Sequence, residues 1–192
     1  MKVHIKEARI TFPVLFEAKQ VNGQGEPKFN CGLLIAKNHP QKAEIERGMV
    51  EAAKAKWGDA KYMDILKQLK AADKLALHDG DAKSDYDGYP GHYFLNASNK
   101  IRPLVIGPDR AALVAADGKP YSGAYVNAIV ELWAQDNQFG KRVNASLLGI
   151  QFVKDGERLA GGGVAAADDF EAIPQDAAKT AATSGDGAAS LF

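Results

Sequence analysis

The sequence predicts a mainly β (α+β) fold, a small five-stranded barrel with an inserted helical segment. Apolar and polar residues alternate in several stretches of the chain, which is the period of a half-buried strand. The period changes to that of a helix only between about residues 40 and 75. The chain has 192 residues, which suits one such domain with a short appendage.

Two strands joined by a hairpin are expected in the N-terminal part. The first covers residues 3–16, where Pro13 indicates a bend or an edge position. The stretch 22–27 is rich in glycine, asparagine and proline and indicates a hairpin loop. Residues 28–36 alternate regularly, so the second strand is expected there, with its apolar side chains on one face.

Two helices are expected in the inserted segment. Pro40 fits the first turn of a helix, and the apolar residues that follow recur at helical spacing as far as Gly58. A second helix is expected from about residue 59 to 74, with an apolar stripe along one side. The polar, glycine-containing stretch 78–92 is too long for a tight turn and predicts a loop.

The strand pattern returns in the second half of the chain. It covers residues 93–106, 124–134 and 142–153, with a loop at 117–123 and a hairpin turn around 136–140. The second of these strands alternates more clearly than any other part of the chain. Its small aliphatic face is expected to line the inside of the barrel.

These elements define the expected domain organisation. Five strands around a helical excursion in fewer than 160 residues are typical of the OB-fold. Residues 1–160 are therefore expected to form an OB-fold-like domain with a helical insert at about 40–75. Residues 161–192 are rich in glycine and alanine with scattered acids, which predicts a flexible acidic C-terminal tail.

The formal net charge of zero conceals an uneven distribution. Residues 164–192 hold five acids and one lysine, a charge of −4, so residues 1–163 hold 23 basic and 19 acidic residues, a charge of +4. This asymmetry suits a polyanion partner without requiring one. No apolar stretch approaches the ~20 residues that span a bilayer. With a single cysteine as well, we expect a cytoplasmic protein that does not enter a membrane.

The outward faces of the later strands indicate a binding surface. Aromatic rings, amides and cations follow one another on these faces. This combination is typical of single-stranded nucleic acid binding, because bases stack on the rings and cations neutralise phosphates. The nucleic-acid-binding residues expected on these grounds are Lys28, Asn30, Phe94, Lys100, Arg102, Tyr121, Tyr125, Asn127, Trp133, Lys141 and Arg142.

Catalytic patterns are weak in this sequence. The four histidines are scattered without metal-ligand spacing, and no serine has the surroundings of a nucleophile elbow. The acids Asp79, Asp81, Asp85 and Asp87 do not fit a calcium loop, because Lys, Ser and Pro occupy required positions. A metal-dependent nuclease that uses these carboxylates is an alternative. We expect no enzymatic activity, no cofactor and no bound metal.

Several stretches resemble, in order and spacing, a family of bacteriophage proteins first catalogued as a domain of unknown function. The resemblance covers about residues 1–170. The stretches are FPVLFEAK (12–19), KFNCGLLIAK (28–37), LHDGDAK (77–83), YPGHYFLNASNKIRPLVI (89–106), YSGAYVNAIVELWAQDN (121–137), NASLLGIQFVKDGERLAGG (144–162) and the acidic Asp168–Asp169–Phe170. Characterised members are single-stranded DNA-binding proteins with an OB-fold. The resemblance implies sequence-tolerant binding of single-stranded DNA in phage replication or recombination, in the cytoplasm of the bacterial host.

The tail fits the same interpretation. Acidic C-termini that end in hydrophobic residues resemble those of bacterial and phage single-stranded DNA-binding proteins. The residues expected to bind replication or recombination proteins are Asp168, Asp169, Phe170, Leu191 and Phe192. A further alternative is a protein-interaction module whose aromatic face is a subunit interface, as in a homodimer.

Overall fold

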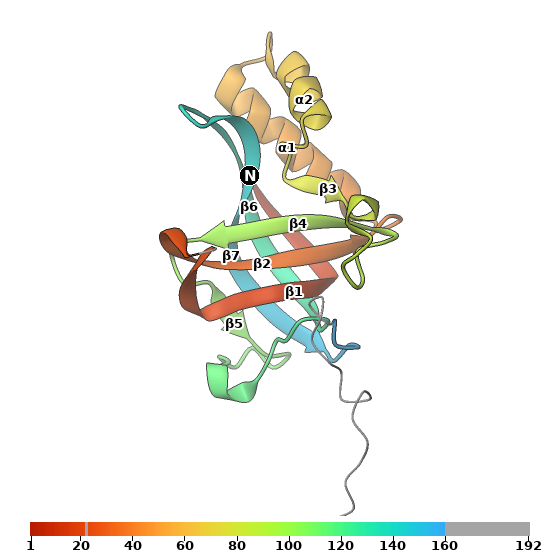
Figure 1. Cartoon of the computed structure of the whole chain (residues 1–192), viewed down its shortest axis with the longest axis vertical. Coiled ribbons are helices and arrows are strands. Elements are labelled where there is room, and N and C mark those ends of the chain that lie inside the picture. Colours follow the sequence, from red (N-terminus) through yellow and green to blue (C-terminus); the bar gives the residue numbers. More distant parts are fainter. Residues whose placement is uncertain (22, 160–192) are drawn as a thin grey trace, which may run out of the picture. The chain divides into compact units, whose positions relative to one another are not determined.

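The strands of the structure form one sheet that closes into a barrel (Figure 1). This computed structural model describes residues 1–21 and 23–159, and the predicted acidic tail, 161–192, lies outside them. The strands are β1 (Lys2–Val21), β2 (Gln24–Ala36), β3 (Leu77–Asp79), β4 (His92–Asn99), β5 (Leu104–Ile106), β6 (Tyr125–Asn137) and β7 (Gly140–Lys154).

Five of these strands make the closed barrel. Their order is β4-β2-β1-β6-β7, and a further pairing between β4 and β7 closes the ring. The β4–β7 pair is parallel, whereas the other barrel neighbours are antiparallel. The short strands β3 and β5 extend the sheet beside β4 and β7. The predicted mainly β fold, a five-stranded OB-fold-like barrel with inserted helices, is confirmed.

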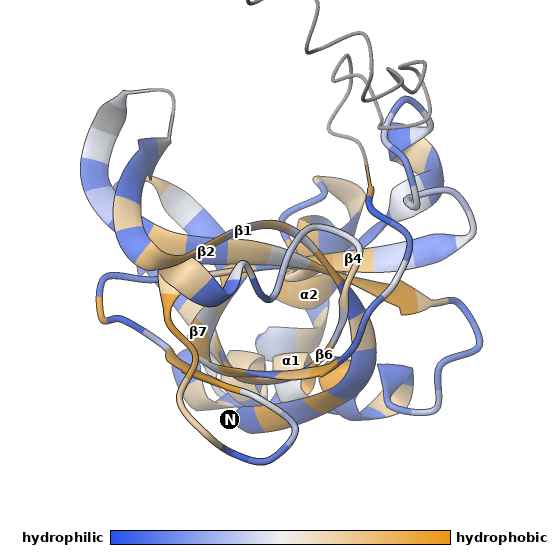
Figure 2. Cartoon of the chain, turned by 90° about the horizontal axis from the view of Figure 1, so that it is seen from below, coloured by the Kyte–Doolittle hydropathy of each residue, from blue (hydrophilic) through white to orange (hydrophobic). Residues whose placement is uncertain are grey.

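Two helices lie between β2 and β3. They are α1 (Lys42–Trp57) and α2 (Tyr62–Ala71), and Figure 2 looks through the ring of strands toward them. The apolar stripe of α1 includes Ile45 and Met49, which are buried in the same cluster as the barrel interior. At Gly48 an added Cβ would lie 2.8 Å from Leu132 Cδ1, so the glycine allows α1 to approach the barrel closely.

The barrel interior follows the alternation of the sequence. Val126, Ala128, Val130 and Leu132 of β6 are at most 1% exposed, which confirms the predicted inner face of this strand. The same period places Cys31 of β2 inside. Because small residues alternate with branched ones, the side chains fill the interior of a narrow barrel.

A second, smaller cluster covers part of the outer side of β2 and β4. It contains Leu34, Tyr89 and Phe94, with Leu159 packed against it. Tyr89 belongs to the segment between the short 3-10 helix η1 (Gly80–Lys83) and β4. This segment falls in the predicted loop and acts as a cover over one end of the sheet.

Three details differ from the sequence prediction. The predicted hairpin loop at 22–27 is shorter, because β1 runs to Val21 and β2 already begins at Gln24. The predicted strand 93–106 is interrupted, because Asn99 turns its side chain to the backbone of Leu147 and Ile101 and the chain leaves the ladder before Pro103. The predicted loop at 78–92 contains a short strand, β3, which pairs with β4. Within the described residues, no helix is long and apolar enough to cross a membrane.

Candidate functional site

A polar groove lies on the outer side of the barrel where β4 and β7 meet. Its volume is about 730 Å³. Its walls come from β2, β4, the segment before β3 and the hairpin of β6 and β7. We call it the β4–β7 groove. Its polar, charged and aromatic lining residues are Lys28, Asp73, Lys74, His78, Asn96, Ser98, Asn99, Lys100, Trp133, Gln135, Phe139, Arg142, Asn144 and Ser146.

Strand alternation explains why polar side chains face this groove. The parallel strands β4 and β7 pair at Ala97 and Ala145, whose small side chains are buried inside the barrel. The residues on either side of each alanine therefore point outward. On β4 these are Asn96 and Ser98, so the groove has a floor of amide and hydroxyl groups.

Two aromatic rings stand at the edge of the groove with much of their surface exposed. Trp133 is 42% exposed, and its indole nitrogen donates a hydrogen bond of 2.9 Å to Ser146 Oγ, which orients the ring. Phe139 is 76% exposed in the hairpin between β6 and β7. Large aromatic surfaces in water are costly, so rings held in this way favour a role in binding.

Four cations line the same groove. Lys28, Lys74 and Arg142 make no ion pair within the part of the chain that the structure describes. The Lys100 ammonium pairs with the Glu26 carboxylate, and this contact lowers the pKa of Glu26. Both partners are exposed, and exposed pairs contribute little to stability. A phosphate can therefore replace Glu26 at low cost.

The structure brings four of the eleven predicted residues into this groove: Lys28, Lys100, Trp133 and Arg142. Asn30 is half-buried beside it and pairs across the strands with Ser98 of the groove. Lys141 belongs to the hairpin but does not line the groove. Its ammonium lies 2.9 Å from the Asp136 carboxylate.

Two predicted residues do not have the expected exposure or position. Phe94 points outward as predicted, but it is only 4% exposed, because Tyr89 packs on it and His78 stacks on its ring with centroids 4.9 Å apart. The prediction of an exposed ring at this position is wrong. Arg102 follows the break after β4 and lies over the ring of Phe16, outside the groove lining.

Three other predicted residues lie toward the opposite end of β6. Tyr125 is eight residues from Trp133, roughly 26 Å along an extended strand. Arg9 and Lys154 lie over its ring, 5.7 and 4.9 Å from the centroid. Asn127 donates to Gln151, and the Tyr121 hydroxyl donates to Asp155. The structure therefore separates these three residues from the β4–β7 groove.

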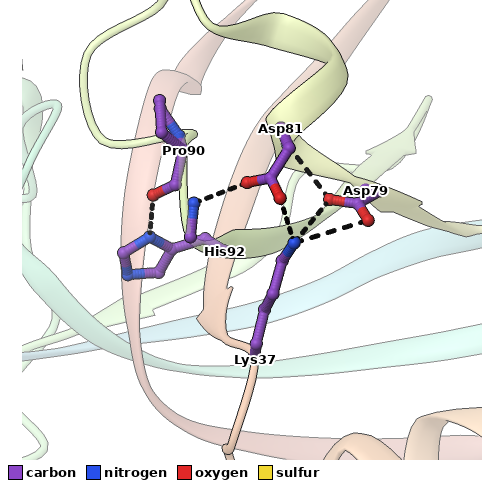
Figure 3. A network of polar contacts seen from close by, with 6 residues as sticks. Lys37, Asp79, Asp81, Pro90 and His92 are labelled. Carbon is purple, nitrogen blue, oxygen red and sulfur yellow. Dashed lines mark hydrogen bonds and ion pairs between the residues drawn. The ribbon is translucent and has the colours of Figure 1, made fainter.

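Asp79 and Asp81, two of the acids in the nuclease alternative, form ion pairs with a lysine. Lys37 places its ammonium between Asp79 and Asp81, 3.1 Å from Asp79 Oδ1 (Figure 3). Asp81 also accepts a 2.7 Å hydrogen bond from the Gly91 backbone, and Lys37 and Gly91 lower its pKa. Among the described residues, no group of three metal-ligating side chains is present. Through Lys37, these two carboxylates connect η1 to the residue that follows β2.

Sequence reasoning missed two functional candidates in the groove. The sequence pattern places Phe139 in the hairpin turn, and a phenylalanine among polar turn residues is itself a signal of a binding tip. The helical pattern extends to Lys74, and only the fold brings this residue next to β7, where its carbonyl accepts a hydrogen bond from the Val143 backbone N–H. The predicted tail residues Asp168, Asp169, Phe170, Leu191 and Phe192 lie outside the described residues.

Comparisons with known proteins identify related phage proteins. The family model of the Enterobacter phage Enc34 single-stranded DNA-binding protein matches residues 1–181. Putative protein p50 of Acyrthosiphon pisum secondary endosymbiont phage 1 is 44% identical over 173 residues, which cover 89% of this chain and 93% of that protein.

Solved structures of phage proteins have a similar fold. The Enc34 single-stranded DNA-binding protein in complex with single-stranded DNA has a TM-score of 0.68 and 25% identity, covering 82% of this chain and 88% of that one. The gp2.5 single-stranded DNA-binding protein of bacteriophage T7 has a TM-score of 0.54 and 14% identity, covering 90% and 98%. At that identity, the T7 likeness shows the fold alone.

Proposed function

This chain belongs to the family of the Enterobacter phage Enc34 single-stranded DNA-binding protein, and we propose that it binds single-stranded DNA through the β4–β7 groove. One observation carries the proposal. A single groove combines two exposed rings, Trp133 and Phe139, with four cations. Rings next to cations on the outer side of an OB-like barrel supply both contacts that a single strand needs.

The chemistry of binding follows from these groups. Bases stack on Trp133 and Phe139, and each such contact contributes about 1–3 kcal/mol. Lys28, Lys74 and Arg142 neutralise phosphates and release counterions, which makes the affinity depend on salt. Every base has a π-face, so stacking tolerates any sequence. The protein then covers strands regardless of their sequence.

The biological role that we infer concerns transient single strands of phage DNA. We infer that the protein covers them during phage DNA replication and recombination in the host cell, without catalysis. The acidic residues Asp168 and Asp169 and the terminal Phe192 recruit replication or recombination proteins. Purified proteins of these classes should bind the immobilised full chain, and Phe192→Ala should weaken that contact. Unchanged binding by this variant would contradict the role of the terminal residue.

The test of DNA binding is a fluorescence-anisotropy titration of labelled oligo-dT at several salt concentrations, with matched duplex as competitor. Trp133→Ala should weaken binding roughly tenfold, because one stacking contact is lost. Arg142→Ala should weaken binding and lower the slope of log K against log salt by about 0.7, since one phosphate contact is lost. Lys61→Ala, an exposed cation outside the groove, is the matched control.

Other outcomes would contradict the proposal in distinct ways. Absence of oligo-dT binding at low salt would contradict the proposed DNA-binding function. Equal DNA affinity of the wild type and Trp133→Ala would show that the DNA-binding site lies outside the groove. Strand cleavage that requires a divalent cation and is lost in Asp79→Asn would favour the nuclease alternative. A tight oligomer without salt-sensitive DNA affinity would favour the subunit interface.

A further inference from the structure

A second aromatic surface lies outside the β4–β7 groove, on the outer side of β1. It consists of Phe12 and Tyr86, which are 45% and 43% exposed. Their rings meet edge to face, with centroids 6.1 Å apart and planes at 86°. Phe12 belongs to neither of the two hydrophobic clusters of the described residues. Core packing therefore does not account for this pair.

The backbone at Phe12 is strained in a way that positions its ring. Its φ is +46°, in the left-handed region, which costs a bulky residue roughly 1–2 kcal/mol. The register with β2 shifts here, from Thr11 opposite Gly32 to Val14 opposite Asn30, so β1 carries one extra residue. Such bulges redirect a side chain next to a functional site. The bulge and the left-handed backbone at Phe12 thus direct its ring away from the core.

The segment before β4 supplies a cation to this surface. The Lys83 ammonium lies 5.7 Å from the ring centroid of Tyr86 and 4.7 Å from that of Phe94. The segment is held in place because the Tyr89 hydroxyl and Thr11 Oγ1 are hydrogen-bonded at 3.2 Å inside the fold. Rings with a cation beside them repeat the chemistry of the groove.

The two surfaces are neighbours across the sheet. Thr11 pairs with Gly32 of β2, and Gly32 pairs with Asn96 of β4, which lines the groove. Two strand spacings of about 4.8 Å separate the residue before Phe12 from the groove wall, roughly 10 Å in all. A DNA strand that leaves the groove needs only a short extension past Tyr89, which covers Thr11 and Gly32, to reach Phe12.

We propose that Phe12 and Tyr86 form a second base-stacking position for the same DNA strand, with Lys83 neutralising its phosphate. The proposal rests on the proposed function of the groove. The occupant is a nucleotide rather than a protein side chain, because Lys83 adds a cation to the exposed rings and because the groove wall at Asn96 lies only two strands away.

The test combines cross-linking with affinities for a length series of oligo-dT. In the wild-type full chain, oligonucleotides with 5-iodouracil should cross-link to Phe12 or Tyr86 only when they are longer than the shortest oligonucleotide that fills the groove. Phe12→Leu and Tyr86→Leu should lower the affinity for long oligo-dT roughly tenfold each and leave the affinity for the shortest binder unchanged. Val114→Ala, an apolar residue that is 53% exposed between β5 and η2 and does not line the groove, is the matched control.

Phe12→Gly separates binding from folding. Glycine accepts the left-handed backbone without strain, so the circular dichroism spectrum and melting temperature should be kept while the affinity for long oligo-dT falls. Unchanged affinities in all three variants, with cross-links confined to the groove, would overturn the second position alone. Failure of the wild type to bind any oligo-dT would overturn the proposed function itself.

Discussion

The indole nitrogen of Trp57 donates a hydrogen bond of 2.9 Å to Oδ2 of Asp136. This contact joins the last residue of α1 to the β6–β7 hairpin, and Lys141 pairs with the same carboxylate from the other strand. Trp133, Phe139 and Arg142 all belong to this hairpin or to the strands next to its turn. The helical insert therefore holds one wall of the β4–β7 groove.

Trp57→Phe should loosen this hairpin without opening the barrel. The phenyl ring keeps the packing of α1 but lacks the hydrogen-bond donor. We expect faster amide hydrogen exchange in residues 135–142 and a loss of oligo-dT affinity of roughly twofold to fivefold, typical of one net hydrogen bond. Asp64→Ala, which removes an exposed acid of α2, is the control. Unchanged hairpin exchange in Trp57→Phe would contradict a holding role for this contact.

The same contact should titrate only in strong acid. Lys141 and then Trp57 hold the pKa of Asp136 below its usual value of 3.8. The stabilisation is therefore fully present above about pH 3.8 and is lost as the pH falls through the lower folded value. The NMR signal of the Trp57 indole N–H should stay constant from pH 7 to 4 and shift below that. Asp136→Asn should abolish this shift, and a midpoint near pH 5 would contradict the assignment.

Cys31 should be inert in the folded protein. It is 2% exposed, and burial raises the pKa of its thiol from 9.0 to about 12. At pH 8 only about one molecule in ten thousand would carry the reactive thiolate. Burial also keeps reagents from reaching the sulfur atom. Ellman's reagent should therefore react with the protein only in denaturant. Rapid reaction of the native protein would show that β2 opens locally.

Gly32→Ala should destabilise the fold by about 1–3 kcal/mol. An added Cβ would lie 2.2 Å from Thr11 Oγ1, which is buried and hydrogen-bonded to Tyr89. Urea denaturation measures the change. Thr11→Ala removes the clashing oxygen, so the double variant should be more stable than the sum of the two single changes predicts. Strict additivity would show that the backbone absorbs the clash elsewhere.

The period of the sequence predicted the inside of the barrel better than its outside. Val126, Ala128, Val130 and Leu132 face a single apolar interior, so the alternation of β6 fixes their side of the sheet. The outward side depends on what covers it. Phe94 faces outward as predicted, yet Tyr89 and His78 cover it, and no local pattern encodes contacts made by a loop.

Only part of the candidate site could be predicted from the sequence, because strand alternation gives the face of a residue and not its neighbours in space. Tyr125 and Trp133 share one face of β6, but a face says nothing about distance along the strand. Arg102 was placed by extending the alternation past Asn99, where side-chain hydrogen bonds end the ladder. Lys74 and Phe139 reach the groove only through the packing of α2 and the length of the hairpin, which single-sequence patterns do not contain.

The parallel pairing of β4 and β7 has a thermodynamic consequence. These strands close the barrel, and the groove has walls on both sides of that closure. A ligand that bridges the two walls binds the closed barrel and not the opened one, so its binding raises the free energy of unfolding by an amount that grows with ligand concentration. At a hundredfold excess over the dissociation constant, this linkage amounts to about 2.7 kcal/mol. If a single strand binds across the groove as we propose, it would therefore stabilise the closed barrel.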